Sequence, residues 1–379
     1  MLYSYKDCYN GGIKDVISCE IPDKRFLTPL FLTFVSQMNE LQNMNSKDTS
    51  GLLTEYQAAH DSTALFDISC RDEIRLTGED RSTFLHGFCT NEINKLQPGQ
   101  GCEAFLTSIQ GKTLGHIFVF AEPNQLVIDT NTGAAEIVIP HWDRYLITED
   151  VTIENVTASR KLFYLTGPEA AALLENIGPQ VAGLGLNEHL QIENEGNCFH
   201  ARRVDWFKQS GFQISVEQEN ADELKKQLIN SGATFAGRQT WETLRIESGF
   251  PEYGVDFNSE NLAQEIARTD LAISFSKGCY LGQEPIARID AIGHVNRLLR
   301  QLKISGTIES TELLTQENLI CTDESEKSLG QITSAATLPQ ATNAESVVVA
   351  IATVRREIAE SGTIVIVKTD SGKYPAIIQ

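Results

Sequence analysis

The amino-acid sequence predicts an α+β protein in which two related subdomains precede a separate C-terminal antiparallel β-barrel or sandwich. Helix-like and strand-like segments alternate between residues 46 and 150, and the alternation recurs between residues 151 and 297. After residue 298, short β-rich runs alternate with polar turns, and no strong helix pattern interrupts them. Residues 1–45 differ from both parts, because Gly11-Gly12 and a short apolar run precede a Gln/Asn-rich stretch. We expect a poorly ordered extension there, with a folded mini-domain as the alternative.

Local signals place the elements of the first subdomain. Asp80 is the expected N-cap of a helix, and Gln110-Gly111-Lys112 is the expected turn of a β-hairpin. Pro140 should bend or interrupt the last helix. In chain order, the expected elements are a helix at 52–64, a strand at 73–78, a helix at 81–88, strands at 103–107, 113–120 and 126–129, and a helix at 134–145.

The second subdomain and the barrel are placed in the same way. Gly167-Pro168-Glu169 opens a helix, and Gly249 suits the position just after a helix C-terminus. The expected elements of the second subdomain are strands at 151–156, 162–165, 199–205 and 211–216 and helices at 170–177, 221–231 and 238–248. The expected barrel strands are 301–305, 319–322, 330–334, 347–354 and 363–367.

Composition limits the classes of partner. The chain has 379 residues and a formal charge of −20, so broad attraction to nucleic acid or to an anionic membrane is not expected. Its eight cysteines include no C-x-x-C pair, which argues against a zinc site and against a disulfide framework. The apolar run from Phe26 to Val35 is too short for a membrane span and makes a poor signal peptide. We therefore expect a cytoplasmic protein.

One nine-residue stretch concentrates reactive groups. Residues 276–284 hold a thiol, Cys279, beside an ammonium group, Lys277, and two glycines that allow a ligand to approach the backbone. A neighbouring cation favours the thiolate, which is the form of cysteine that attacks and ligates. The alternative is a strand–turn–helix corner that holds a buried and inert cysteine.

Two further features suggest a ligand. Glu247 falls in the last turn of its expected helix, where the helix dipole disfavours an anion, and a carboxylate suits the adjacent donors of a pterin or guanine. A solvated surface glutamate is the alternative. The segment from Lys277 to Arg300 also carries a net charge of +2, from four cations against Glu284 and Asp290. It would attract a folate glutamate tail or a phosphate, unless it is a solvated face.

Several catalytic motifs are absent from the sequence. It contains no Walker-type phosphate loop, no G-x-G-x-x-G after a strand, no H-E-x-x-H and no G-x-S-x-G. His86, His116 and His294 have no metal-ligand spacing, so structural roles are expected for them.

Residues 277–284, Lys-Gly-Cys-Tyr-Leu-Gly-Gln-Glu, resemble the K-G-C-[FY]-x-G-Q-E signature of the YgfZ family. These are folate-binding proteins related to the aminomethyltransferase, or T-protein, of the glycine cleavage system. The resemblance covers residues 50–379. It extends to Leu65–Ser69, the spacing of Phe84-Leu85, Thr90-Asn91, Leu96 and Gly99, Arg245–Gly249 with Gly254 and Asp256, and Gly330–Ser334.

The resemblance implies a folate-binding core of paired subdomains, at about 46–150 and 151–297, closed by a barrel at 298–379. It implies tetrahydrofolate or a derivative as cofactor, with contacts from Glu247, Asn91, Tyr280, Gln283 and Arg288. It assigns the chemistry to Cys279, tuned by Lys277, with Cys279 as a transient metal ligand at most. The implied partners are iron–sulfur enzymes, such as tRNA-modifying proteins, or factors that assemble their clusters.

The chain departs from the T-protein at one point. The aminomethyltransferase carries an Asp-Asp pair after a glycine-rich turn, and one Asp assists chemistry at the folate. Gly115 and His116 stand at those positions here, so aminomethyl transfer is not expected. A folate-dependent one-carbon transferase and a scaffold that binds no folate remain the alternatives.

Overall fold

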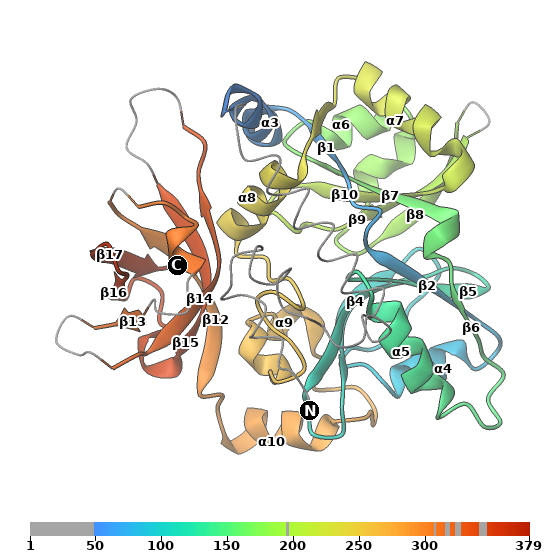
Figure 1. Cartoon of the computed structure of the whole chain (residues 1–379). Helices are drawn as coiled ribbons and strands as arrows, with labels where there is room; N and C mark the ends of the chain where they lie inside the picture. The colour runs from blue at the N-terminus through green and yellow to red at the C-terminus, as the bar shows by residue number, and fades with distance from the viewer. Residues whose placement is uncertain (1–48, 195–196, 307, 315–318, 323–326, 341–346) are drawn as a thin grey trace, which may run out of the picture. The chain divides into compact units, whose positions relative to one another are not determined.

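The fold is that of a computed structural model, which describes residues 49–379 except 195–196, 307, 315–318, 323–326 and 341–346 (Figure 1). The extension expected at residues 1–45 lies outside the described residues. Within the described part, no helix combines the length and the apolar character needed to cross a membrane.

A five-stranded antiparallel sheet forms from the first part of the chain, in the order β3-β4-β5-β2-β6. Apolar side chains from one face of the sheet pack with those of α4 and α5 around Trp142. Gln110-Gly111-Lys112 turns between β3 and β4, as predicted. The elements are β2 (Asp72–Thr77), α4 (Arg81–His86), β3 (Gly101–Thr107), β4 (Thr113–Ala121), β5 (Gln125–Thr130), α5 (Ala134–Asp143) and β6 (Thr152–Asn155).

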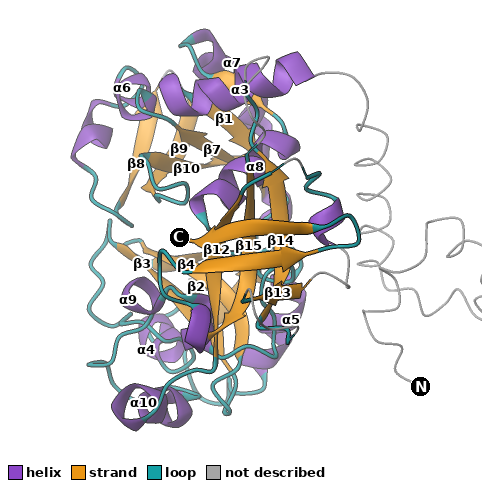
Figure 2. Cartoon of the chain, turned by 90° about the vertical axis from the view of Figure 1, so that its left-hand side faces the viewer, coloured by secondary structure: helices purple, strands orange, loops and turns teal. Residues whose placement is uncertain are grey.

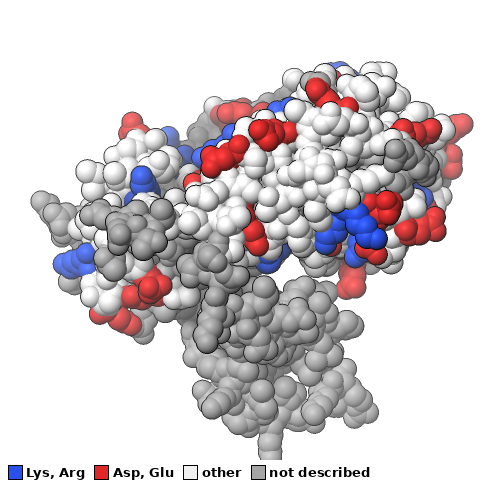
Figure 3. Space-filling model, turned by 90° about the horizontal axis from the view of Figure 1, so that it is seen from above, with Lys and Arg blue, Asp and Glu red and all other residues white. Residues whose placement is uncertain are grey.

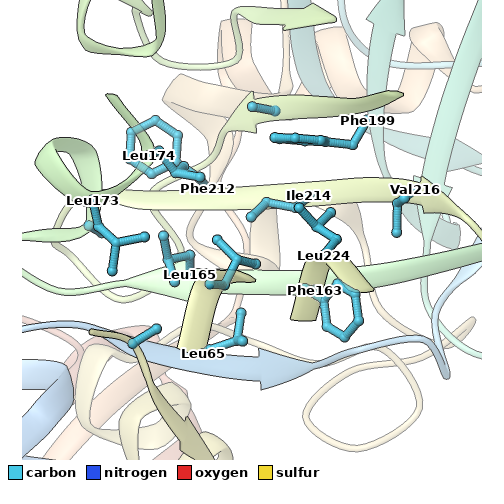
Figure 4. Packing of buried hydrophobic residues seen from close by; sticks show 14 of the residues in the cluster. Leu65, Phe163, Leu165, Leu173, Leu174, Phe199, Phe212, Ile214, Val216 and Leu224 are labelled. Atoms are coloured by element: carbon cyan, nitrogen blue, oxygen red, sulfur yellow. The ribbon is translucent and has the colours of Figure 1, made fainter. Parts of the chain in front are cut away.

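A second sheet has six strands in the order β11-β1-β7-β10-β9-β8. Its core packs Leu65, Phe163, Leu165, Phe212 and Ile214 against α6 and α7 (Figure 4). The elements are α3 (Thr49–Asp61), β1 (Ala64–Asp67), β7 (Arg160–Thr166), α6 (Ala170–Glu175), β8 (His189–Asn194), β9 (Asn197–Arg203), β10 (Gly211–Glu217), α7 (Ala221–Asn230) and β11 (Thr234–Ala236).

The two sheets do not divide the chain in the order that the sequence suggested. β1 precedes β2 but pairs with β7 and β11 of the six-stranded sheet. Its continuous apolar run, Ala64-Leu65-Phe66, is buried on both faces, as a central strand requires. β6 follows residue 150 but pairs with β2, and its mostly exposed side chains suit the edge of the five-stranded sheet.

Polar side chains connect the buried faces of the two sheets. Arg202 of β9 donates to Glu73 of β2 at 3.0 Å and to Gln213 of β10 at 2.9 Å. Gln213 donates in turn to Asp129 of β5 at 2.7 Å, and Asp129 pairs with Arg71 at 2.6 Å. Every charged group in this hydrogen-bonded network has a partner. Pairing of this kind is the condition for burying charges without a large desolvation penalty.

The C-terminal part is a closed six-stranded antiparallel barrel, so the predicted fold class is confirmed. Its strand order is β12-β15-β14-β13-β16-β17, and β12, β15 and β14 face the viewer in Figure 2. The sequence patterns missed the last strand. The barrel elements are β12 (Arg297–Ile304), β13 (Leu319–Cys321), β14 (Gly330–Thr337), β15 (Val348–Arg355), β16 (Ile364–Lys368) and β17 (Lys373–Ile378).

Three helices, α8 (Arg238–Ser248), α9 (Thr269–Ala272) and α10 (Gln283–Ile292), lie in the chain between the sheets and the barrel. α8 contacts α3 and β14, and it ends at Gly249 in the left-handed conformation, as predicted. Asp80 occupies the N-cap position of α4, as predicted, but it does not cap the helix with its side chain. Its carboxylate instead accepts from the backbone N–H of Asp150 at 2.9 Å.

Candidate functional site

The loop that carries the signature is fixed at both ends, to the C-terminal end of α4 with the turn that follows it and to β3. The Lys277 ammonium group is buried and donates to the carbonyl oxygens of His86 at 2.7 Å and Cys89 at 2.6 Å. Burial lowers the pKa of Lys277. Lys277 therefore anchors the loop, and no contact joins its ammonium group to Cys279 in the described residues.

The other end of the loop is held through its backbone. Leu281 donates its N–H to Gly87 and accepts from the Thr107 hydroxyl at 2.6 Å. Gly282 has φ +86°, and a Cβ atom there would overlap the Ser108 carbonyl, so only glycine fits before α10. The Cys279 thiol is exposed between these two anchors. The buried-cysteine alternative is wrong for this residue.

The other residues expected to contact folate either have structural partners or are exposed on the surface. Tyr280 is buried, which raises its pKa to about 12, and the Lys277 ammonium lies 4.6 Å from its ring centroid. Asn91 donates to the carbonyls of Glu103 at 2.8 Å and Leu271 at 3.0 Å. Gln283 begins α10, and Arg288 is exposed on the same helix. Asn91 and Tyr280 thus have partners within the protein, whereas Gln283 and Arg288 lie on α10.

Glu247 faces helix α3. Its carboxylate accepts from the Tyr56 hydroxyl at 2.6 Å and contacts His60 Nε2 at 3.0 Å. This hydrogen bond raises the pKa of His60. The two donors compensate for the unfavourable position of this carboxylate at the end of α8. Contacts within the fold therefore account for an anion at this position, and no ligand is needed to explain it.

A small cavity lies on the opposite side of α8. Its enclosed space is about 30 Å³, enough for a water molecule or two, and it widens toward solvent. A bicyclic ligand would therefore have to displace side chains at the rim. The lining includes residues after β1 and β5, His116 on β4, Trp241 and Arg245 on α8, and the turn Phe250–Tyr253.

His116 belongs to a buried charge network beside this cavity. Its Nε2 lies 2.7 Å from Oε1 of Glu103, which also forms an ion pair with Arg268. Burial opposes ionisation of Glu103, but Arg268 and His116 together outweigh it and lower the Glu103 pKa to about 2. Burial also lowers the pKa of His116, so the imidazole is neutral near pH 7 and donates its Nε2 proton to the carboxylate.

Glu252, at the rim of the cavity, has an oxygen with no hydrogen-bond donor. Its Oε2 is buried and lies 3.4 Å from Nε of Arg245, yet it accepts no hydrogen bond among the described residues. A buried acceptor in this state needs an explanation, and a ligand N–H is one. The aromatic rings of Trp241 and Tyr253 line the same space.

Arg245 joins the cavity to the barrel. It pairs with Asp256 at 2.5 Å and donates to the Ser334 hydroxyl of β14 at 2.9 Å. The Thr333 and Ser334 hydroxyls both donate to Asp256 Oδ1 at 2.6 Å. The segments Arg245–Gly249 and Gly330–Ser334, singled out in the sequence, thus meet in a buried clamp.

The cationic patch expected at 277–300 is divided in the structure. Lys277 binds two carbonyls, and Arg300 donates to the Ala359 carbonyl at 2.8 Å. Arg288 and Arg297 are exposed on α10 and β12. Among the described residues, no group of three or more His, Cys, Asp and Glu has the arrangement of a metal site.

Sequence reasoning missed the residues that line the cavity. Arg71, Trp241, Glu252 and Tyr253 come from separate segments and share no motif. The one available signal was helical spacing, because Trp241 and Arg245 are four residues apart and so share one face of α8, whereas Glu247 does not.

Several proteins of similar sequence or fold are transferases by name. Residues 18–277 match the model described as the GCVT N-terminal domain. A putative chloroplastic transferase of Arabidopsis thaliana is 27% identical over 71% of this chain and 60% of its own length. The aminomethyltransferase of Deinococcus deserti is 28% identical over 55% of this chain and 59% of its own, and that of Synechocystis is 26% identical over 72% and 76%.

The chain thus spans about 60% of the length of the first two relatives. The crystal structure of glycine cleavage system aminomethyltransferase T from Bartonella henselae superposes with a TM-score of 0.73 at 20% identity, over 86% of this chain and 88% of that one. This likeness confirms the fold, including the barrel. Because the family model matches more than half of the chain, this protein belongs to the GCVT N-terminal domain family.

Proposed function

We propose that this protein binds tetrahydrofolate or a derivative in the cavity beside α8 and supports iron–sulfur enzymes in the manner of the YgfZ family. The observation that carries folate binding is the buried Oε2 of Glu252 at an aromatic rim, which lies 3.4 Å from Arg245 Nε but accepts no hydrogen bond among the described residues. A carboxylate there suits the adjacent N–H groups of a pterin ring, and Trp241 and Tyr253 offer faces on which the ring can stack. Glu252 takes the role first expected of Glu247, whose carboxylate is occupied by α3.

Cys279 supplies the second part of the proposal. The thiol is exposed on a loop that Lys277 and Leu281 fix to the end of α4, to the turn after it and to β3, so a partner meets it in one defined position. Its role is to bind or transfer a metal, or to react with a partner protein. The iron–sulfur assignment rests on the signature of residues 277–284.

A gene-deletion experiment tests this proposal. Loss of the gene should lower the activity of iron–sulfur enzymes, including those that modify tRNA, while enzymes without clusters keep theirs. The wild-type gene should restore the activity, whereas Cys279→Ala and Glu252→Gln should fail to restore it at equal protein levels. Full rescue by Cys279→Ala contradicts the thiol role, and full rescue by Glu252→Gln contradicts the folate role.

A folate-dependent aminomethyl or one-carbon transferase is the second candidate, and the names of the relatives favour it. The buried Glu103–His116 pair beside the cavity is the group that would transfer a proton there. A turnover assay with an aminomethyl-lipoyl carrier protein and tetrahydrofolate discriminates between the candidates. The proposed function predicts no turnover, and turnover abolished by His116→Gln would establish the transferase.

A further inference from the structure

An open cleft lies where α10 leads into the barrel, away from both the cavity and the thiol. Its volume is about 630 Å³, within the range of small-molecule sites, and it is lined by His294, Asn296, Arg297, Arg355, Arg356 and Glu357. The approach of α10 to β12 is visible in Figure 1. Three guanidinium groups and an imidazole thus face one carboxylate.

The placement of two of these arginines is unfavourable for folding. Arg297 and Arg355 are directly opposite each other on the antiparallel strands β12 and β15. Like charges at such paired positions repel each other and destabilise a sheet. In the described part of the chain, none of the three arginines forms an ion pair within 4.0 Å, although the whole protein carries a charge of −20. Acidic residues are abundant in the sequence, yet among the described residues Glu357 is the one that lines this cleft.

The backbone beneath the arginines is fixed. Arg356 donates its N–H to the carbonyl of Asn296 at 3.0 Å, and Arg355 donates to that of Leu329 at 2.7 Å. The guanidinium groups consequently project from a rigid base. The face in Figure 3 differs, because Lys and Arg there lie interspersed with Asp and Glu.

We propose that this cleft binds a small ligand with at least two anionic oxygen-bearing groups, phosphate or carboxylate. Guanidinium groups bind such groups through paired N–H donors, and three of them match a ligand charge of −2 to −4. The ligand cancels the repulsion between Arg297 and Arg355, so binding stabilises the barrel. The overall negative field excludes extended polyanions and leaves the cleft to compact ligands.

Calorimetric titration of the full chain at low ionic strength tests the proposal, with pyrophosphate and citrate as separate probes and chloride as the control salt. At least one probe should bind, and its binding should raise the melting temperature. The variant Arg297→Gln/Arg355→Gln should bind at least tenfold more weakly. Without any probe, the same variant should melt at the wild-type temperature or above it, because a repulsive pair has been removed.

Lys303→Gln is the matched control, since Lys303 is exposed on β12 outside the cleft. It should bind the probe as the wild type does. Absence of binding by both probes overturns the proposal, as does equal binding by the double variant. A single-stranded RNA 12-mer tests the size of the ligand. If it binds more tightly than either probe, and if the double variant loses this binding, the proposal of a compact ligand is wrong.

Discussion

The loop around Cys279 and the cavity beside α8 are built in opposite ways. In the loop, buried groups are fully paired and one reactive atom, the Cys279 sulfur, is left exposed. In the cavity, charged groups from distant segments are paired with one another, and one buried acceptor, Glu252 Oε2, has no donor. The loop is thus built to present a thiol, and the cavity is built to recognise a ligand. We therefore expect that substitutions can disrupt the loop and the cavity independently.

The largest expected effect lies on the cavity side. Arg245→Met leaves Asp256 buried without its cation and breaks the clamp to β14. Removal of one partner of a buried ion pair typically costs about 3–5 kcal/mol, so we expect a loss of that size in the free energy of unfolding. Urea denaturation measures it. Glu247→Gln, on the other face of α8, is the control and should lose less than about 1 kcal/mol. Equal losses would refute the clamp.

The matching prediction for the loop concerns Lys277. Lys277→Met leaves the carbonyls of His86 and Cys89 without a donor, at a cost of about 2–3 kcal/mol of unfolding free energy. Cys279→Ser, at an exposed position, should cost less than about 0.5 kcal/mol. Because Lys277 anchors the loop and does not touch the thiol, thiol labelling in native Lys277→Met should not be slower than in the wild type. A much slower reaction with unchanged stability would show that Lys277 tunes the thiol instead.

Much of the loop was predictable from sequence, and little of the cavity was. A contiguous signature with two glycines identified residues 277–284, since one short segment supplies every group. The anchoring hydrogen bonds of Lys277 were not predicted, because its partners are carbonyls about 190 residues earlier in the chain. The helix dipole raised Glu247 as a candidate and the family resemblance favoured it, whereas the compensating donors on α3 leave no local trace in the sequence. The sheet to which β1 belongs could not be predicted for the same reason, because its partner strands β7 and β11 are far away in the sequence.

The pH dependence of stability gives a smaller effect with a defined sign. Burial lowers the folded-state pKa of His116, so the unfolded chain takes up a proton that the folded protein does not. The contribution of His116 to the free energy of unfolding is therefore complete above about pH 6.5. It is lost as the pH falls, by up to about 1.4 kcal/mol per pH unit. His116→Gln, which keeps a donor for Glu103, should flatten the slope of unfolding free energy between pH 7.5 and 5.5.

His60 should act in the opposite direction. Its hydrogen bond to Glu247 raises the folded-state pKa, so its contribution is present at low pH and is lost as the pH rises through that value. His60→Gln should therefore steepen the slope that His116→Gln flattens. Because His60 is half exposed, the change should be well under about 1 kcal/mol. The same sign for both variants would refute these assignments.

Folate binding in the cavity beside α8 is tested most directly by a titration with tetrahydrofolate, in which binding is measured by tryptophan fluorescence and by calorimetry. Trp241 lines the cavity, and Trp206 lies under Arg71 at 4.8 Å, so a bound pterin should quench the emission. We predict saturable quenching of the wild type, the same Kd for Cys279→Ser and Glu247→Gln, and a Kd at least tenfold higher for Glu252→Gln. Absence of quenching and of heat in the wild type, or unchanged binding by Glu252→Gln, would contradict this prediction.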